Sequence, residues 1–189
     1  MKVPKTNNSN KLPPEGSHLG VCIALIDLGT QTVTWQGDTK LLRKVRIGFE
    51  LPDEKAVFKE EKGEQPFTIY KDYTLSLSDK SNLRKDLESW RGKKFSDEET
   101  GDYDLKNILG KTGLVSIVHS PSKDGSQTYA NLSTITQLPK GMAREVTPVN
   151  PIKYFSLMEP DWNVFEEFPD FLKEKIRASK ELQTKPFGS

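Results

Sequence analysis

Alternating apolar and polar residues predict two β-strands, at residues 40–51 and 66–78. The first run places its apolar residues on one parity: Leu41, Val45, Ile47, Phe49 and Leu51. The opposite parity carries Lys44, Arg46, Gly48 and Glu50. Because side chains alternate between the two faces of a strand, one face is expected in the core and the other toward solvent or a ligand.

The second run follows the same pattern with a single exception. Phe67, Ile69 and Tyr73 share the inward parity, whereas Tyr70 falls on the outward one. Lys71 interrupts the inward parity, which predicts a β-bulge or a strand end that lets its amine reach water. The residues between the two runs are too polar for burial and are expected to form a loop.

Further strands are expected before and after this pair. Residues 17–28 are almost continuously apolar, as in a strand that is covered on both sides or bent around a barrel corner. Residues 29–39 read as a loop or hairpin tip that contains Trp35. Two more strands are predicted at residues 112–120 and 126–138, joined by a turn that contains Lys123.

Helical spacing appears between the third and fourth strands and again near the end of the chain. Leu83, Leu87 and Trp90 recur at helical intervals, with Ser81 as the expected N-cap and Gly92 as the expected C-terminal glycine. A second short helix is expected over residues 102–110, and a last one over residues 168–182.

Five strands with a helical insert between strands 3 and 4 have the connectivity of an OB-fold, a five-stranded Greek-key barrel. We therefore expect a mainly β protein with short helices. The expected organisation is a disordered N-terminal arm at residues 1–16, the barrel at 17–138, and an irregular acidic and aromatic extension with a terminal helix at 139–189.

Composition excludes several classes of protein. No apolar run reaches the 18 or so residues that a membrane helix needs, and the first residues resemble no secretory signal. Cys22 is the single cysteine, which excludes an internal disulfide and fits a reducing cytoplasm. His18 and His119 have no metal-ligand spacing and no nucleophile motif is present, so no enzyme, metal or cofactor is expected.

The outward face of strands 2 and 3 is the usual oligonucleotide surface of an OB-fold, together with the loops between strands 1 and 2 and between strands 4 and 5. Cations there can neutralise phosphates, and aromatic rings can stack on bases. The predicted binding residues are Trp35, Arg43, Lys44, Arg46, Tyr70, Lys71, Lys123 and Tyr129. Each cation has an alternative interpretation as an ordinary solvated residue, and Tyr70 as a residue packed under a loop.

The chain resembles a group of phage and prophage OB-fold proteins described as binding single-stranded DNA or as associated with replication. The resemblance covers residues 17–182 and is carried by IALIDLGTQ, RKVRIGFELPDE, YTLSLSDKSNLRKDLESWRGKKF, DYDLKNILGK, YANLSTITQLPKG and PDFLKEKIRASKEL. It implies a protein of the host-cell cytoplasm that coats single-stranded DNA, with little sequence preference, during phage replication or recombination. It implies no individual site residues.

The acidic, aromatic segment at residues 159–171 supports an alternative function. Such a segment can recruit replication or recombination enzymes, which would make the protein an adaptor. It can also simply pack on the barrel through Trp162, Phe165 and Phe168. A second acidic cluster, at residues 97–104, is expected to supply charge at a helix N-terminus. Self-association through strand edges leaves a homodimer open.

Overall fold

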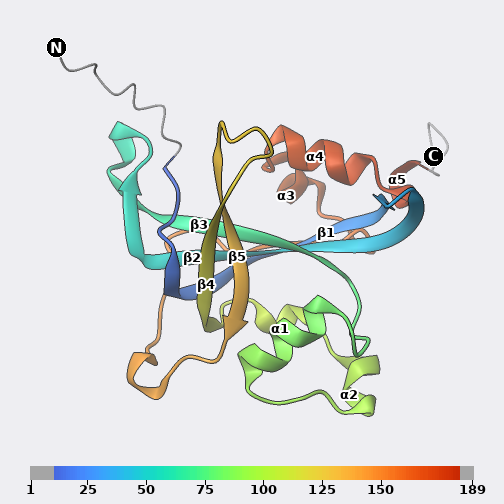
Figure 1. Cartoon of the computed structure of the whole chain (residues 1–189), viewed down its shortest axis with the longest axis horizontal. Helices are drawn as coiled ribbons and strands as arrows, with labels where there is room; N and C mark the ends of the chain where they lie inside the picture. The colour runs from blue at the N-terminus through green and yellow to red at the C-terminus, as the bar shows by residue number, and fades with distance from the viewer. Residues whose placement is uncertain (1–10, 184–189) are drawn as a thin grey trace.

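A computed structural model describes residues 11–183 of the chain. In it, the two alternating runs at residues 40–51 and 66–78 lie mainly in neighbouring strands of one sheet (Figure 1). The strands are β1 (Gly16–Trp35), β2 (Asp38–Val57), β3 (Glu64–Thr74), β4 (Thr112–Pro121), β5 (Thr128–Thr136) and β6 (Lys153–Phe155). Their order is β3-β2-β1-β4-β5, and all neighbours in this series are antiparallel. The short strand β6 pairs with β1 in parallel.

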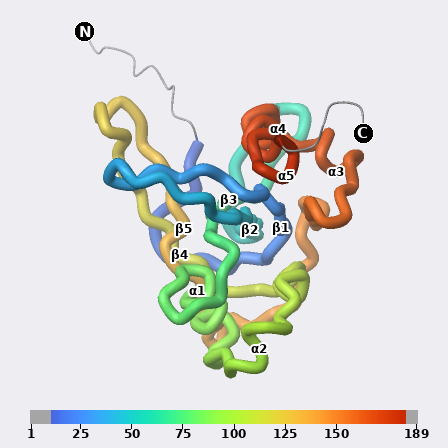
Figure 2. Tube along the Cα trace, turned by 90° about the vertical axis from the view of Figure 1, so that its right-hand side faces the viewer, coloured from blue at the N-terminus to red at the C-terminus, as the bar shows by residue number. Residues whose placement is uncertain are grey.

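Short helices lie on both sides of this sheet, with α1 and α2 on one side and α3 to α5 on the other (Figures 1 and 2). They are α1 (Asn82–Arg91), α2 (Asp97–Asp102), α3 (Trp162–Glu166), α4 (Asp170–Arg177) and α5 (Lys180–Gln183). Single 3₁₀ turns occur at Glu60–Lys62, Leu105–Ile108 and Lys140–Met142. The expected order of three strands, a helical insert and two strands is therefore present, with β6 added.

Helix α1 has both of the end signals expected from its sequence. The Ser81 hydroxyl accepts a hydrogen bond from the Arg84 amide, and Gly92 takes the left-handed conformation with a φ of 67°. Such caps satisfy backbone groups that a helix end leaves without partners. The buried residues Leu83, Leu87 and Trp90 then face the sheet.

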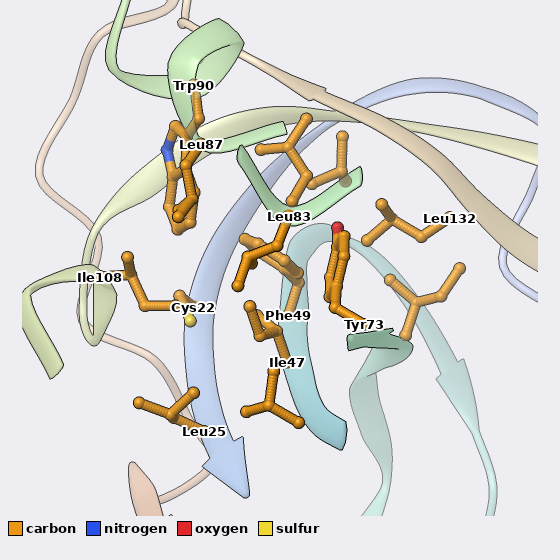
Figure 3. Close-up of a cluster of buried hydrophobic side chains, with 14 of the residues drawn as sticks. Cys22, Leu25, Ile47, Phe49, Tyr73, Leu83, Leu87, Trp90, Ile108 and Leu132 are labelled. Atoms are coloured by element: carbon orange, nitrogen blue, oxygen red, sulfur yellow. The ribbon is translucent and has the colours of Figure 1, made fainter. Parts of the chain in front are cut away.

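Strand β1 is covered on both faces, as its continuous apolar run predicts. Cys22 and Leu25 point into a cluster with Ile47, Phe49 and Trp90 (Figure 3). The opposite face of β1 contributes to a second cluster, whose members are Val21, Ile23, Ala24, Ile26, Leu28, Phe155, Phe165, Phe168, Leu172 and Ile176. Because this second cluster joins β1 to the C-terminal segment, that segment is part of the fold's packing.

The Lys71 side chain connects the edge strands β3 and β5. The β2–β3 register runs without interruption from Lys44 to Leu51, so the bulge expected at Lys71 is absent. Its ammonium group donates to the Asp86 carboxylate at 2.8 Å and to the Ser133 carbonyl of β5 at 3.0 Å. A side chain thus links the two edge strands, in an open sheet that is compatible with a barrel-like fold.

Several segments expected to be irregular are regular. Strand β1 continues to Trp35, and the hairpin turns at Gln36 and Gly37, both with positive φ. The presumed polar loop at residues 52–65 is mostly strand, because β2 bulges after Leu51 and then pairs with the start of β3. The acidic cluster, expected only as charge at a helix N-terminus, lies largely within a helix of its own, α2 (Asp97–Asp102).

The predicted disordered arm is partly described. Residues 1–10 lie outside the described part of the chain. Beyond them, the His18 ring bonds the Pro14 carbonyl at 2.7 Å, and the His119 ring bonds the Pro13 carbonyl at 2.8 Å. These contacts hold the segment before β1 against the sheet.

Candidate nucleic-acid interface

A groove of about 1000 Å³ follows the edge of β3. Consecutive residues of β3, from Pro66 to Tyr70, line it, so both inward and outward side chains of the strand edge contribute. The other walls come from the segment before β1, β2, the β2–β3 turn, the first residues of β3, the start of β5, the segment before β6, and α4. They are Lys11, Leu12, Pro13, Arg46, Phe58, Lys59, Lys62, Gln65, Tyr129, Ala130, Asn150 and Phe171.

Exposed aromatic rings border this groove from four different elements. Phe58, Tyr70, Tyr129 and Phe171 are 49%, 45%, 50% and 60% exposed. Phe58 packs edge-on against Phe67, with ring centroids 5.1 Å apart. Such half-exposed rings can stack on unpaired bases.

Tyr70 owes its position to a glycine on the neighbouring strand. Tyr70 and Gly48 are directly paired across β2 and β3. A Cβ atom on Gly48 would lie only 2.4 Å from the Tyr70 ring. The absence of a side chain at Gly48 therefore lets the Tyr70 ring lie across β2, toward Arg46 in the same groove.

The charge of the groove is positive. Lys11, Arg46, Lys59 and Lys62 line it, and none of the described lining residues is acidic. Within residues 11–183, no ion-pair partner is found for Lys59 or Lys62. The Lys11 ammonium group donates to the Val57 carbonyl, which attaches the segment before β1 to the end of β2.

Arg46 is held by an acid from β3 and a ring from α4. Its guanidinium donates to both Asp72 carboxylate oxygens, at 2.7 Å and 3.0 Å, and lies 5.4 Å from the centroid of the Phe171 ring. Lys175 of α4 also bonds Asp72, at 3.1 Å. Burial alone would raise the pKa of Asp72, but the hydrogen bonds and charges of Arg46 and Lys175 hold it below the usual range.

The remaining strand cations predicted to bind lie outside the groove. Arg43 donates to Asp27 of β1 at 2.6 Å, and this hydrogen bond raises the pKa of Arg43. Lys44 donates to the Thr74 hydroxyl at 2.9 Å. Lys71 is bound to Asp86 and Ser133, as described above. Strand parity identified these side chains, but it could not identify their partners on other elements.

Trp35 lies far from the groove. It is 73% exposed at the tip of the β1–β2 hairpin, at the end of the sheet opposite the β2–β3 turn (Figure 1). Trp35 is paired with Asp38 across the hairpin. The distance along β2 from Asp38 to Arg46 is roughly 25 Å for an extended strand. Lys123 is exposed in the β4–β5 turn, while Tyr129 at the start of β5 lines the groove. Of the predicted residues, the groove brings together Arg46, Tyr70 and Tyr129.

The cations and exposed aromatic residues of the groove that sequence reasoning missed are Lys11, Phe58, Lys59, Lys62 and Phe171. Phe58 and Lys59 lie between the two predicted strands, where the sequence predicts a polar loop. Lys11 lies in the N-terminal arm, which the sequence predicts to be disordered. The available signal was the single aromatic residue, Phe58, between charged residues of that loop. Phe171 lies in the predicted last helix, and its ring is 60% exposed and contacts Arg46.

Other chemically reactive side chains take structural positions. Burial raises the pKa of the Cys22 thiol to about 12. In α2, Glu99 completes a capping box with Ser96 and pairs with Arg91 at 2.6 Å, so these acids stabilise the N-terminus of α2 itself. No group of acids, histidines or cysteines within residues 11–183 is arranged to hold a metal ion.

The C-terminal segment packs on the sheet through its aromatic residues. Phe165 and Phe168 are buried against Phe155 of β6, and Trp162 is half-exposed beside Phe155. These contacts agree with the expectation that the segment packs on the fold through Trp162, Phe165 and Phe168. None of the helices in the described part of the chain has the length and apolarity that a membrane crossing requires.

Neither a scan against protein-family models nor a search of curated proteins finds a match to this chain.

Proposed function

We propose that the protein binds single-stranded DNA in the groove along the β3 edge and has no catalytic activity of its own. The observation that carries this proposal is that Lys59 and Lys62, which have no ion-pair partner among residues 11–183, line the same groove as exposed rings, and that none of the described lining residues is acidic. Lysines neutralise phosphates, whereas rings need unpaired bases to stack on. Duplex DNA, whose bases are already stacked, offers only the first of these contacts.

We further propose that the sheet is an OB-fold barrel. The strand order β3-β2-β1-β4-β5, with the helical insert between β3 and β4, supports this assignment. So does the Lys71 bridge from β3 to Ser133 of β5, at the position where such a barrel closes. The binding surface would then be shifted from the middle of strands 2 and 3 toward the β3 edge and the β2–β3 turn.

The decisive experiment measures fluorescence anisotropy of a labelled 20-base dT oligonucleotide at two salt concentrations. Wild-type binding should weaken as salt rises and should resist a duplex competitor. Tyr70→Ala should lose about tenfold in affinity, because stacking on one ring contributes roughly 1–3 kcal/mol per base. Tyr70→Phe keeps the ring and should bind like the wild type.

Absence of binding at low salt would overturn the proposal. The adaptor alternative would then be tested with full-length protein. Removal of residues 159–189 is unsuitable for that purpose, since it would uncover the apolar outer face of β1. Equal binding by Tyr70→Ala and wild type would place the DNA elsewhere on the molecule.

A further inference from the structure

A second, smaller pocket lies beneath α4 and adjoins the groove. Its volume is about 310 Å³, near the lower end of the ~300–1,000 Å³ typical of small-molecule sites. Arg46, Tyr70, Asn150 and Phe171 line both hollows, so these side chains stand between them. The floor of the pocket is apolar and consists of Ile23, Ile26, Phe168 and Leu172.

The rim of this pocket carries hydrogen-bond donors and acceptors. Lys153 of β6 and Glu167, next to α3, form an ion pair of 2.9 Å. The buried Glu50 carboxylate accepts from the Asn150 side-chain amide at 2.7 Å and from the Asn150 backbone at 2.8 Å. Since a carboxylate can only accept, the NH₂ group of Asn150 faces Glu50, and its amide oxygen remains an acceptor at the pocket wall.

We propose that this pocket receives one base of the strand bound in the groove, and that it favours a base with an exocyclic amino group. This inference rests on the proposed function. An apolar floor with a few polar groups suits a flat heterocycle turned out of a single strand. The Glu167 carboxylate and the Asn150 amide oxygen are acceptors for an amino group, which cytosine has and thymine lacks.

The pairing of charges in the two hollows supports this arrangement. The groove is lined by cations and by no acid among the described residues, and its Lys59 and Lys62 have no ion-pair partner among residues 11–183, whereas the cations of the pocket are paired, Lys153 with Glu167 and Arg46 with Asp72. Phosphates therefore remain favoured at Lys59 and Lys62, and a neutral base is the part of the strand that can approach Glu167 without repulsion. Tyr70 and Phe171 line both sites.

The test compares dC and dT oligonucleotides of 20 bases with full-length protein at pH 8, where cytosine is unprotonated. We expect the wild type to bind dC about fivefold more tightly than dT. This ratio corresponds to the lower end of the free energy of a bidentate base contact, because the Glu167 side chain is 63% exposed. Glu167→Gln should reduce this ratio to below twofold. Glu166→Gln makes the same change of charge one residue away, outside the pocket lining, and should preserve the ratio.

The outcomes separate the two proposals. Equal wild-type binding of dC and dT, or a preference that survives in Glu167→Gln, would overturn the base pocket while the groove proposal stands. Failure of both oligonucleotides to bind would overturn the groove proposal and the base pocket with it. A preference lost equally in Glu166→Gln would be an effect of net charge, and would also overturn the base pocket.

Discussion

Lys71 and Lys62 belong to the same β2–β3 hairpin but lie in very different surroundings. In the middle of β3, the Lys71 ammonium group is fixed by Asp86 of α1 and the Ser133 carbonyl of β5. At the hairpin turn, Lys62 lines an acid-free groove without an ion-pair partner among residues 11–183. The first lysine joins elements of the fold, and the second retains a charge that a ligand can use.

The comparison extends to the neighbouring cations. Arg43 is fixed by Asp27 and Arg46 by Asp72, whereas Lys59 resembles Lys62. A cation on a regular strand face meets side chains from adjoining strands and helices, which can supply an acid. A cation at a turn has fewer neighbours, so its charge is more often left for a partner.

Loss of Lys71 should give the largest effect, and it should be on stability. Lys71→Ala leaves the Asp86 carboxylate, which has a side-chain exposure of 13%, without its counter-charge. We expect a loss of about 2 kcal/mol in the free energy of unfolding, measured by urea denaturation. Affinity per folded molecule for dT oligonucleotides should be unchanged.

The matched control for that variant is Lys62→Ala, which should alter the free energy of unfolding by less than about 0.5 kcal/mol. A stable Lys71→Ala protein with weakened DNA binding would reverse the roles that we assign to these two lysines.

The turn lysines should control affinity. The double variant Lys59→Ala, Lys62→Ala should lose about tenfold in affinity for dT at low salt and reduce the salt slope by about 1.4, because each single-strand phosphate contact contributes roughly 0.7. Anisotropy titrations over a salt series measure both values. Lys85→Ala, Lys94→Ala removes two exposed lysines in and just after α1, and should preserve the slope. Equal losses in both double variants would indicate a dependence on net charge alone.

Asp72→Asn should weaken the restraint on the Arg46 guanidinium, which is paired with Asp72. The substitution removes the negative charge that Arg46 and Lys175 share. We expect a gain of about threefold in affinity at low salt and a loss of about 1 kcal/mol in stability. Decreased affinity would mean that Asp72 must orient Arg46 for binding.

The same carboxylate predicts a response to acid. Its folded-state pKa is lowered, so the stability it adds is present at neutral pH and is lost below the ordinary aspartate pKa of about 3.9. Asp72→Asn should therefore lose less stability than the wild type between pH 5 and pH 3. Parallel acid-unfolding curves for the two proteins would contradict this expectation.

Trp35→Ala should have the smallest effect. Trp35 lies at the hairpin tip, roughly 25 Å along β2 from the groove. Affinity for a dT oligonucleotide of only 6 bases should change by less than twofold. A larger loss with 30 bases than with 6 would show that a long strand reaches the hairpin tip. A strong loss with 6 bases would move the primary site to that tip.

Much of the fold could be predicted from local patterns. The parity of β2 and β3, the unbroken apolar run of β1 and the caps of α1 each depend on neighbours in the sequence. Strand β6 escaped prediction because only Lys153–Phe155 pairs with β1, and three residues show no periodicity. Its pairing depends on the distant apolar face of β1.

The candidate site was less predictable for a related reason. Tyr70 and Arg46 were identified by parity, and both line the groove. The fixed state of Arg43 and Lys71 depends on Asp27 and Asp86, which lie far from them along the chain. Lys59 and Lys62 were overlooked because a charged segment reads as solvated loop, whether or not the fold places it beside exposed rings.

The second cluster on β1 also bears on how the chain folds during synthesis. The outer residues of β1, among them Val21, Ile23 and Ile26, are covered by Phe155, Phe165 and Ile176. These partners leave the ribosome more than a hundred residues after β1. Until then the nascent sheet would present an uncovered apolar strip, and transient apolar exposure of this kind promotes association between chains. A product that ends before β6 would keep the β3 edge but lack Phe171 of the groove, and the outer face of β1 would stay uncovered.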